Sequence, residues 1–287
     1  RSVLELDEKL EGRDADVVIL GNSMARVGLR TKTIEEEFGT VAGLMVSHSQ
    51  APTWYAVLKN RVYGNGYRPH LILVAGLIDD ALGVAAGDEV DRAKLAEQLA
   101  GPDPVLDKKV FGNDTSLWGV LNANRARTRR EALVGIRNLT VFGLRGFRGS
   151  WTQAEAEAER AFEATLGDDQ LNWGLLDQVD ADTAAHVTST APPEQSLVPD
   201  LIALAHEFGS QIVFVRMPVA PSHGGKDKVA PELEREFVKF LNDNGAGYVE
   251  TRMHVLPVDF QDRLHLSPEG QVRFTSDVVA QLLEIGA

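Results

Sequence analysis

The apolar run Ala15-Asp16-Val17-Val18-Ile19-Leu20 is followed directly by Gly21-Asn22-Ser23. Valine and isoleucine favour strands, and a short apolar run without polar alternation is typical of a strand buried on both faces of a parallel sheet. Gly21 ends the run. The sequence therefore predicts a central strand, with Ser23 just beyond its carboxyl end.

Similar runs and helical patterns alternate on both sides of the middle of the chain. We expect further strands near 43–47, 71–75, 211–216 and 247–250, with helices near 53–62, 231–242 and 272–285. Strands that alternate with helices indicate a parallel sheet covered on both faces. The predicted fold class is a three-layer α/β/α, flavodoxin-like fold.

Two capping signals mark expected helix starts. Thr33-Ile34-Glu35-Glu36 has the spacing of a capping box, and Gly39 would end that helix. Ser267-Pro268-Glu269 supplies an N-cap, a first-turn proline and a first-turn acid before the last helix.

Between residues 83 and 193 the alternation stops, and helical periods rich in Ala, Glu, Arg and Leu replace it. We predict a single α/β domain over 1–287 with a helical insertion, or cap, at 83–193. The insertion contains the one basic and aromatic segment of the chain, which runs from Arg125 to Trp151. This segment is either a solvated helix face followed by a loop whose aromatics enter the core, or a surface for an anionic substrate, lipid head groups or a partner.

Composition excludes several classes of function. The chain has 287 residues, a net charge of -13 and 44% hydrophobic residues, which suit one large domain and argue against a general nucleic-acid surface. Zero cysteines exclude a thiolate metal site and a cysteine nucleophile. The histidines lack the spacing of a metal site, so we expect no metal, and no cofactor is implied.

The sequence Asp262-Arg263-Leu264-His265 lies just before the last predicted helix. A serine is a poor nucleophile unless a base lies within hydrogen-bond reach and a third group orients that base. Asp262 can hold one ring nitrogen of His265 while the other faces outward. Because ligands of doubly wound sheets bind at the carboxyl ends of the strands, we expect Ser23 to meet this pair there.

Gly21-Asn22-Ser23 together with Asp262-Arg263-Leu264-His265 resembles the SGNH, or GDSL-type, hydrolase family. That family has Gly-Asp-Ser after its first strand and Asp-x-x-His near its C-terminus. The resemblance covers about residues 14–80 and 205–287 and leaves the insertion unexplained. It implies a catalytic triad of Ser23, Asp262 and His265 that transfers acyl groups through an acyl-serine intermediate.

The chain departs from the family pattern at two oxyanion positions. The family's glycine after the second strand is absent, so a backbone N–H near Ser49 or Gln50 would replace it. Ile78 takes the place of the family's asparagine after the third strand. Asn22 either substitutes for that asparagine as an oxyanion donor or forms the turn.

The expected function is a serine-dependent hydrolase of carbohydrate or lipid acyl esters, since water is the default acceptor. One alternative is an O-acyltransferase for cell-envelope polysaccharide with a membrane-bound acyltransferase partner, like membrane-linked members of the family. The other is a non-catalytic binding module. The chain starts without methionine, so we expect an upstream signal or anchor and an extracytoplasmic, periplasmic location, with the cytoplasm left open.

Arg216 ends a predicted strand at the same edge of the sheet. A guanidinium there suits a substrate carboxylate or phosphate, and it equally suits an ion pair with Asp79 or Asp80.

Overall fold

A computed structural model describes residues 15–45, 50–83, 103–110, 191–221 and 230–287. Its centre is a five-stranded parallel sheet in the order β2-β1-β3-β4-β5, which is the order of flavodoxin-like sheets. The strands are β1 (Val17–Gly21), β2 (Val41–Met45), β3 (Leu71–Gly76), β4 (Gln211–Arg216) and β5 (Gly247–Glu250). The predicted fold class is confirmed.

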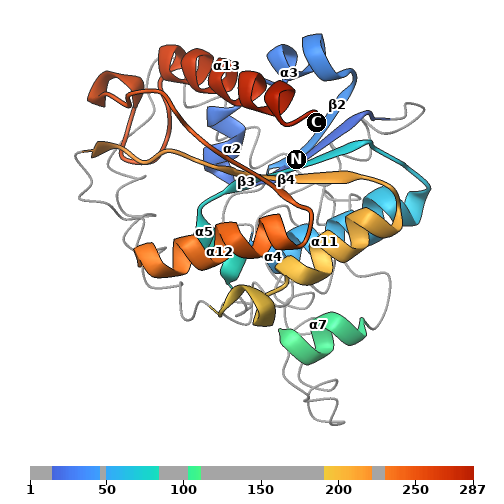
Figure 1. The fold of residues 1–287 in the computed structure, drawn as a ribbon. Helices are drawn as coiled ribbons and strands as arrows, with labels where there is room; N and C mark the ends of the chain where they lie inside the picture. The colour runs from blue at the N-terminus through green and yellow to red at the C-terminus, as the bar shows by residue number, and fades with distance from the viewer. Residues whose placement is uncertain (1–14, 46–49, 84–102, 111–190, 222–229) are drawn as a thin grey trace, which may run out of the picture.

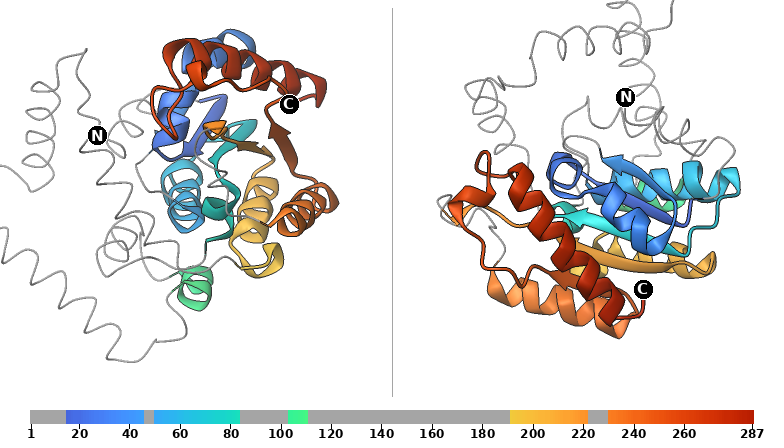
Figure 2. Two further views of the ribbon diagram at one scale, coloured as in Figure 1. Left: turned by 90° about the vertical axis from the view of Figure 1, so that its left-hand side faces the viewer. Right: turned by 90° about the horizontal axis from the view of Figure 1, so that it is seen from above.

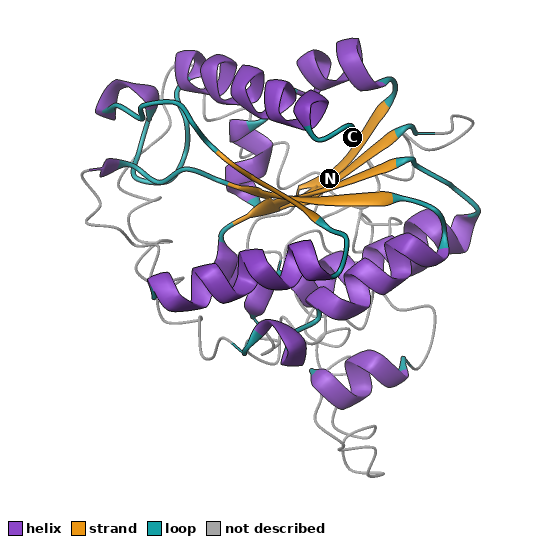
Figure 3. Ribbon diagram, viewed as in Figure 1, coloured by secondary structure: helices purple, strands orange, loops and turns teal. Residues whose placement is uncertain are grey.

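Helices cover both faces of the sheet, as Figures 1 and 3 show. One face carries α2 (Ser23–Gly28), α3 (Thr31–Phe38) and α13 (Pro268–Glu284). The other carries α4 (Ala51–Val57), α5 (Ile78–Leu82), α11 (Val198–Glu207) and α12 (Pro231–Asp243). The remaining short elements are a π-helix at Leu58–Val62 that continues α4, 3-10 turns at Tyr63–Asn65, Pro193–Gln195 and Pro257–Asp259, and α7 (Pro104–Lys109).

The strands supply alternate side chains to two apolar cores. Val18 and Leu20 of β1 pack beneath α4 and α11, whereas Val17 and Ile19 pack beneath α2 and α13. Every residue of β1 and β3 is buried, which is why neither strand shows polar alternation in the sequence. Phe274 of α13 is fully buried in the second core.

Helix starts follow the sequence in one case and depart from it in another. Ser267 caps α13 as predicted, and its Oγ accepts from the Gly270 N–H at 3.2 Å. The capping box predicted at Thr33 is wrong, because α3 already begins at Thr31 after Arg30. The Arg30 N–H donates to Thr275 Oγ of α13 at 3.0 Å, so a contact distant in sequence fixes this end.

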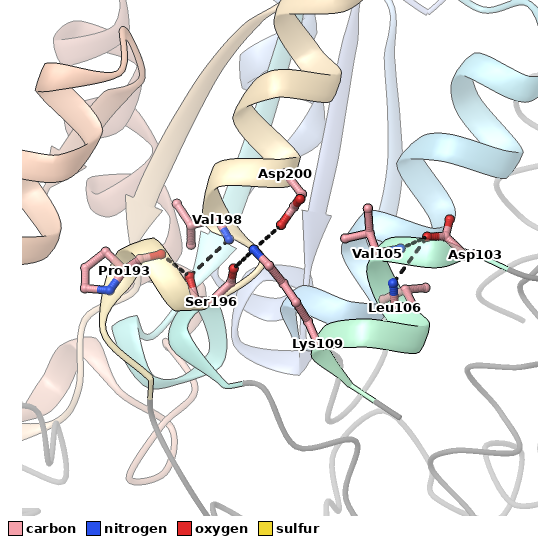
Figure 4. Close-up of polar contacts among 8 residues, drawn as sticks. All are labelled: Asp103, Val105, Leu106, Lys109, Pro193, Ser196, Val198 and Asp200. Carbon is pink, nitrogen blue, oxygen red and sulfur yellow. Dashed lines mark hydrogen bonds and ion pairs between the residues drawn. The ribbon is translucent and has the colours of Figure 1, made fainter. Parts of the chain in front are cut away.

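Most of the predicted insertion at 83–193, including its basic and aromatic segment, lies outside the described residues. Helix α7 within it is held at both ends. Asp103 pairs with Lys59 at 2.7 Å. Figure 4 shows the Asp103 cap at the start of the helix and the pair of Lys109 with Asp200, which lie 2.6 Å apart. The Ala191 N–H donates to the Leu82 carbonyl at 3.1 Å, so the described chain on the two sides of the insertion meets.

Within the ranges that the structure describes, no helix is long and apolar enough to cross a bilayer.

Phe274→Ala tests how far the fold depends on α13. We expect the free energy of unfolding to fall by about 3–5 kcal/mol, because a fully buried ring leaves a cavity when it is removed. Val272→Ala on the same helix is the control, since Val272 is 42% exposed. Urea unfolding followed by circular dichroism measures both, and equal losses would contradict this role of Phe274.

Candidate active site

Ser23 is held by a sharp passage from β1 into α2. A Cβ added at Gly21 would lie 2.5 Å from Ala25 Cβ and 2.7 Å from the Ala75 carbonyl oxygen, so only glycine lets α2 fold back this closely. Asn22 is the N-cap, and its Oδ1 accepts from the Met24 N–H at 3.0 Å. Ser23 is therefore the first residue of α2.

Asp262 and His265 lie on a tight loop that its own backbone closes. Phe260 and Leu266 form an isolated antiparallel bridge. Inside that bridge, the Gln261 N–H donates to the His265 carbonyl at 3.0 Å. Such closure keeps the acid and the histidine at the tip of a loop with fixed backbone geometry.

The buried carboxylate of Asp259 anchors the base of this loop. Asp259 is 1% exposed, its Oδ2 accepts from the Leu256 N–H at 2.8 Å, and its Oδ1 pairs with Arg273 of α13. A Cβ at Gly270 would collide with the Asp259 carbonyl. The loop and the first turn of α13 therefore form one packed unit.

Helix α13 also forms hydrogen bonds with the C-terminal end of α2. Gln271 Nε2 donates to the Val27 carbonyl at 2.6 Å, and Thr275 Oγ accepts from Arg30 just after α2. Figure 2 shows α13 on the same side of the sheet as α2 and α3. Because one helix contacts both the serine's helix and the acid–histidine loop, the two parts of the candidate site are fixed relative to each other.

The structure brings the three predicted catalytic residues together. Ser23 Oγ lies 3.1 Å from His265 Nε2, and His265 Nδ1 lies 2.7 Å from Asp262 Oδ2. A carboxylate only accepts hydrogen bonds, so Nδ1 carries the proton and Nε2 is left to accept from the serine hydroxyl. The histidine and aspartate side chains keep 14% and 18% exposure, so the site is reached from solvent.

Asp262 is held as a carboxylate. Burial acts to raise its pKa, but hydrogen bonds from the His265 ring and from the backbone N–H groups of His265 and Leu264 outweigh burial and lower the pKa below its ordinary value. Those two backbone bonds are 2.6 and 2.7 Å long and both reach Oδ1. Oδ2 remains for the imidazole.

The predicted oxyanion residues have different surroundings. The Asn22 side chain caps α2, and its Nδ2 donates to Asp80 Oδ2 at 2.7 Å. Of the two roles expected for Asn22, oxyanion donor or turn former, these contacts match the turn former. Gln50 is the N-cap of α4, and it follows β2 at the same sheet edge where Ser23 follows β1. Ser49 lies outside the described residues. Ile78 is buried, with 2% exposure, at the start of α5.

Arg216 ends β4 as predicted and pairs with two acids that the sequence did not suggest. Its guanidinium contacts Glu234 of α12 and lies 2.7 Å from Glu250 at the end of β5. These contacts commit the guanidinium to partners within the protein, and a role in binding substrate stays a prediction.

Sequence reasoning missed Asp80 as a neighbour of the candidate nucleophile. The sequence suggests Asp80 only as a partner for Arg216. One feature of the sequence could have indicated this contact: Asp80 follows the third strand, and Ser23 follows the first strand at the same carboxyl edge of the sheet. Among the described residues no group of three or more acids or histidines could hold a metal ion.

No family model matches this sequence, and no curated protein matches it. Several solved structures are similar in fold. A protein proposed to be an acylhydrolase from Bacteroides fragilis is 11% identical with a TM-score of 0.44, covering 98% of this chain and 94% of its own. A GDSL-like lipase from Bacteroides thetaiotaomicron is 10% identical with a TM-score of 0.42, covering 97% and 95%.

LAE5, an alpha/beta hydrolase enzyme from the metagenome of Lake Arreo in Spain, is 10% identical with a TM-score of 0.42, covering 93% of this chain and 94% of its own. Identities near 10% and TM-scores below 0.5 assign no family.

The lowered pKa of Asp262 predicts a pH effect on stability. A carboxyl whose pKa is lowered in the folded state stabilises the fold at pH values above its pKa in the unfolded chain, here 3.8. That contribution is lost as the pH falls through the pKa of the folded state. Asp262→Asn lacks this contribution. We therefore expect its unfolding free energy to decline less than that of wild type below pH 3.8, as measured by urea unfolding. Parallel curves for the two proteins would contradict the prediction.

Proposed function

We propose that this protein is a serine-dependent acyl-ester hydrolase that works through an acyl-serine intermediate. The observation that carries the proposal is the continuous contact from Ser23 Oγ through the His265 ring to Asp262, with distances of 3.1 and 2.7 Å. A nucleophile, a base and an orienting acid in this order are the parts that acyl transfer requires.

In the first half of the reaction, Ser23 Oγ attacks the ester carbonyl carbon while His265 Nε2 takes the hydroxyl proton. Asp262 stabilises the imidazolium that forms. The tetrahedral intermediate then collapses: the bond from carbon to the leaving oxygen breaks, and Nε2 returns the proton to that oxygen. The alcohol leaves, and the acyl group stays on Ser23.

In the second half, water takes the place of the alcohol. His265 removes a proton from water as its oxygen attacks the acyl carbon, and Nε2 then protonates Ser23 Oγ as the acyl–serine bond breaks. The products are a carboxylic acid and the free enzyme. If a sugar hydroxyl attacks instead of water, the same steps produce an O-acylated sugar.

The developing oxyanion needs hydrogen-bond donors. The Ser23 N–H is at the first position of α2, where backbone N–H groups have no acceptor within the helix. We assign the second donor to the backbone near Ser49 or Gln50. With Ile78 in the third position, one donor is lost, which typically costs about 10²- to 10³-fold in rate. A slow turnover of simple esters is therefore expected.

The proposed substrates are acyl esters of carbohydrates or lipids. The net charge of -13 disfavours strongly anionic substrates, and the partly exposed histidine and aspartate leave room for an ester carried on a larger molecule. The choice between hydrolysis and transfer is put to the experiment.

Ser23→Ala tests the mechanism. We expect hydrolysis of p-nitrophenyl acetate to fall by about 10³-fold or more and covalent labelling by a fluorophosphonate to be lost, because no nucleophile remains. His265→Ala is expected to lower both to a similar extent. Ser276→Ala, on the exposed side of α13, is the matched control.

The outcomes separate the candidate functions. Equal turnover by wild type and Ser23→Ala would refute the serine mechanism and leave the fold as a binding module. Acetylated sugar formed by wild type when a sugar acceptor is added, and absent with Ser23→Ala, would assign the transferase function instead of the hydrolase. Mass spectrometry of the products measures this.

A further inference from the structure

The loop after β3 reaches the serine's helix through Asp80. Asp80 Oδ2 accepts from Asn22 Nδ2 at 2.7 Å and from the Leu77 N–H at 3.0 Å. Asn22 is 8% exposed, and its other amide atom, Oδ1, accepts from the Met24 N–H in the first turn of α2. The Asn22 side chain therefore joins Asp80 to the turn that carries Ser23.

The sheet brings the two loops together. Gly21 of β1 pairs with Ala75 of β3, so Asn22 and Gly76 come next at the same edge. A Cβ at Gly76 would lie 3.1 Å from the Trp54 ring and 3.2 Å from Asp80 Oδ2, both closer than ordinary van der Waals contact. A glycine at this position leaves space for the carboxylate.

The contact restricts which residue can precede Ser23. A carboxylate at position 80 accepts hydrogen bonds but donates none, so its partner has to donate. The amide of Asn22 donates to Asp80 and still accepts from Met24. An aspartate at position 22 would accept from Met24 but would oppose a second carboxylate, and two carboxylates at such a distance repel.

We propose that Asp80 is a positioning residue for Ser23: it fixes the Asn22 side chain and, through it, the first turn of α2, which sets the direction of Ser23 Oγ and of the Ser23 N–H. This inference rests on the proposed function, because it assigns Asp80 to the same site. It also explains why Gly-Asn-Ser stands in this chain where the family resembled above has Gly-Asp-Ser.

A reciprocal exchange of the two residues tests the inference. Asn22→Asp alone restores the Gly-Asp-Ser motif, yet we expect it to lower the rate constant for fluorophosphonate labelling of Ser23 by about 10- to 100-fold, a coupling usual for residues in direct contact. Asp80→Asn alone is expected to cost less than about tenfold, because an amide oxygen can still accept from Asn22 and Leu77.

The double variant Asn22→Asp/Asp80→Asn is expected to recover to within about tenfold of wild type. The NH2 group at position 80 then donates to the carboxylate at position 22, which still accepts from the Met24 N–H. The Leu77 N–H loses the acceptor that it shares with Asn22 in the wild type, so recovery stays incomplete. Asn242→Asp, on the exposed side of α12, makes the same chemical change away from the site and is the matched control. Labelling is measured at a temperature at which circular dichroism shows every variant folded.

Two readouts separate positioning from a merely structural contact. A structural contact changes the unfolding free energies of the four proteins without changing the labelling rate of the folded forms. Labelling by Asn22→Asp at the wild-type rate, or a double variant no faster than Asn22→Asp, would overturn the inference. Absence of labelling in wild type would overturn the proposed function instead. The cycle of unfolding free energies needs no activity, so it would then decide whether Asn22 and Asp80 are coupled. An absence of coupling between them would overturn the inference as well.

Discussion

The packing of α13 against α2 is the contact on which the candidate site depends. Gln271 holds the Val27 carbonyl, Thr275 holds Arg30, and the buried ring of Phe274 fills the core beneath them. The first turn of the same helix is packed against the loop of Asp262 and His265. The hydrogen bond of 3.1 Å between Ser23 and His265 tolerates little displacement. A single helix that contacts both α2 and the loop of His265 keeps these two residues at this distance.

The strands and the three residues of the proposed triad could be predicted because their signals are local or follow from a general rule. Fully buried parallel strands give short apolar runs, and β4 and β5 have the predicted bounds. The carboxyl edge of a doubly wound sheet is where loops converge, so Ser23 and His265 were expected to meet. Short helices such as α2 and α5 were missed because five or six residues carry too little periodicity.

Contacts between side chains from different elements could not be predicted in the same way. Glu234 and Glu250 reach Arg216 from α12 and β5, and only the docking of that helix beside that strand makes them neighbours. The pairing of Asn22 with Asp80 depends on the register between β1 and β3 and on how α5 turns away from the sheet. No spacing within the sequence encodes either arrangement.

The direct pairing of β3 with β4 has a consequence for folding kinetics. Leu71 pairs with Gln211 across the whole insertion. The free-energy cost of closing a loop rises by only about 0.6 kcal/mol for each doubling of its length. Distant pairing slows folding far more than it weakens the fold. The strands β1, β2 and β3 are close in sequence and can assemble early, whereas the loop of His265 arrives with the last helix. The hydrogen bond between Ser23 and His265 therefore joins the end of the first strand to the loop before the last helix, and it forms only when both ends of the described fold are in place.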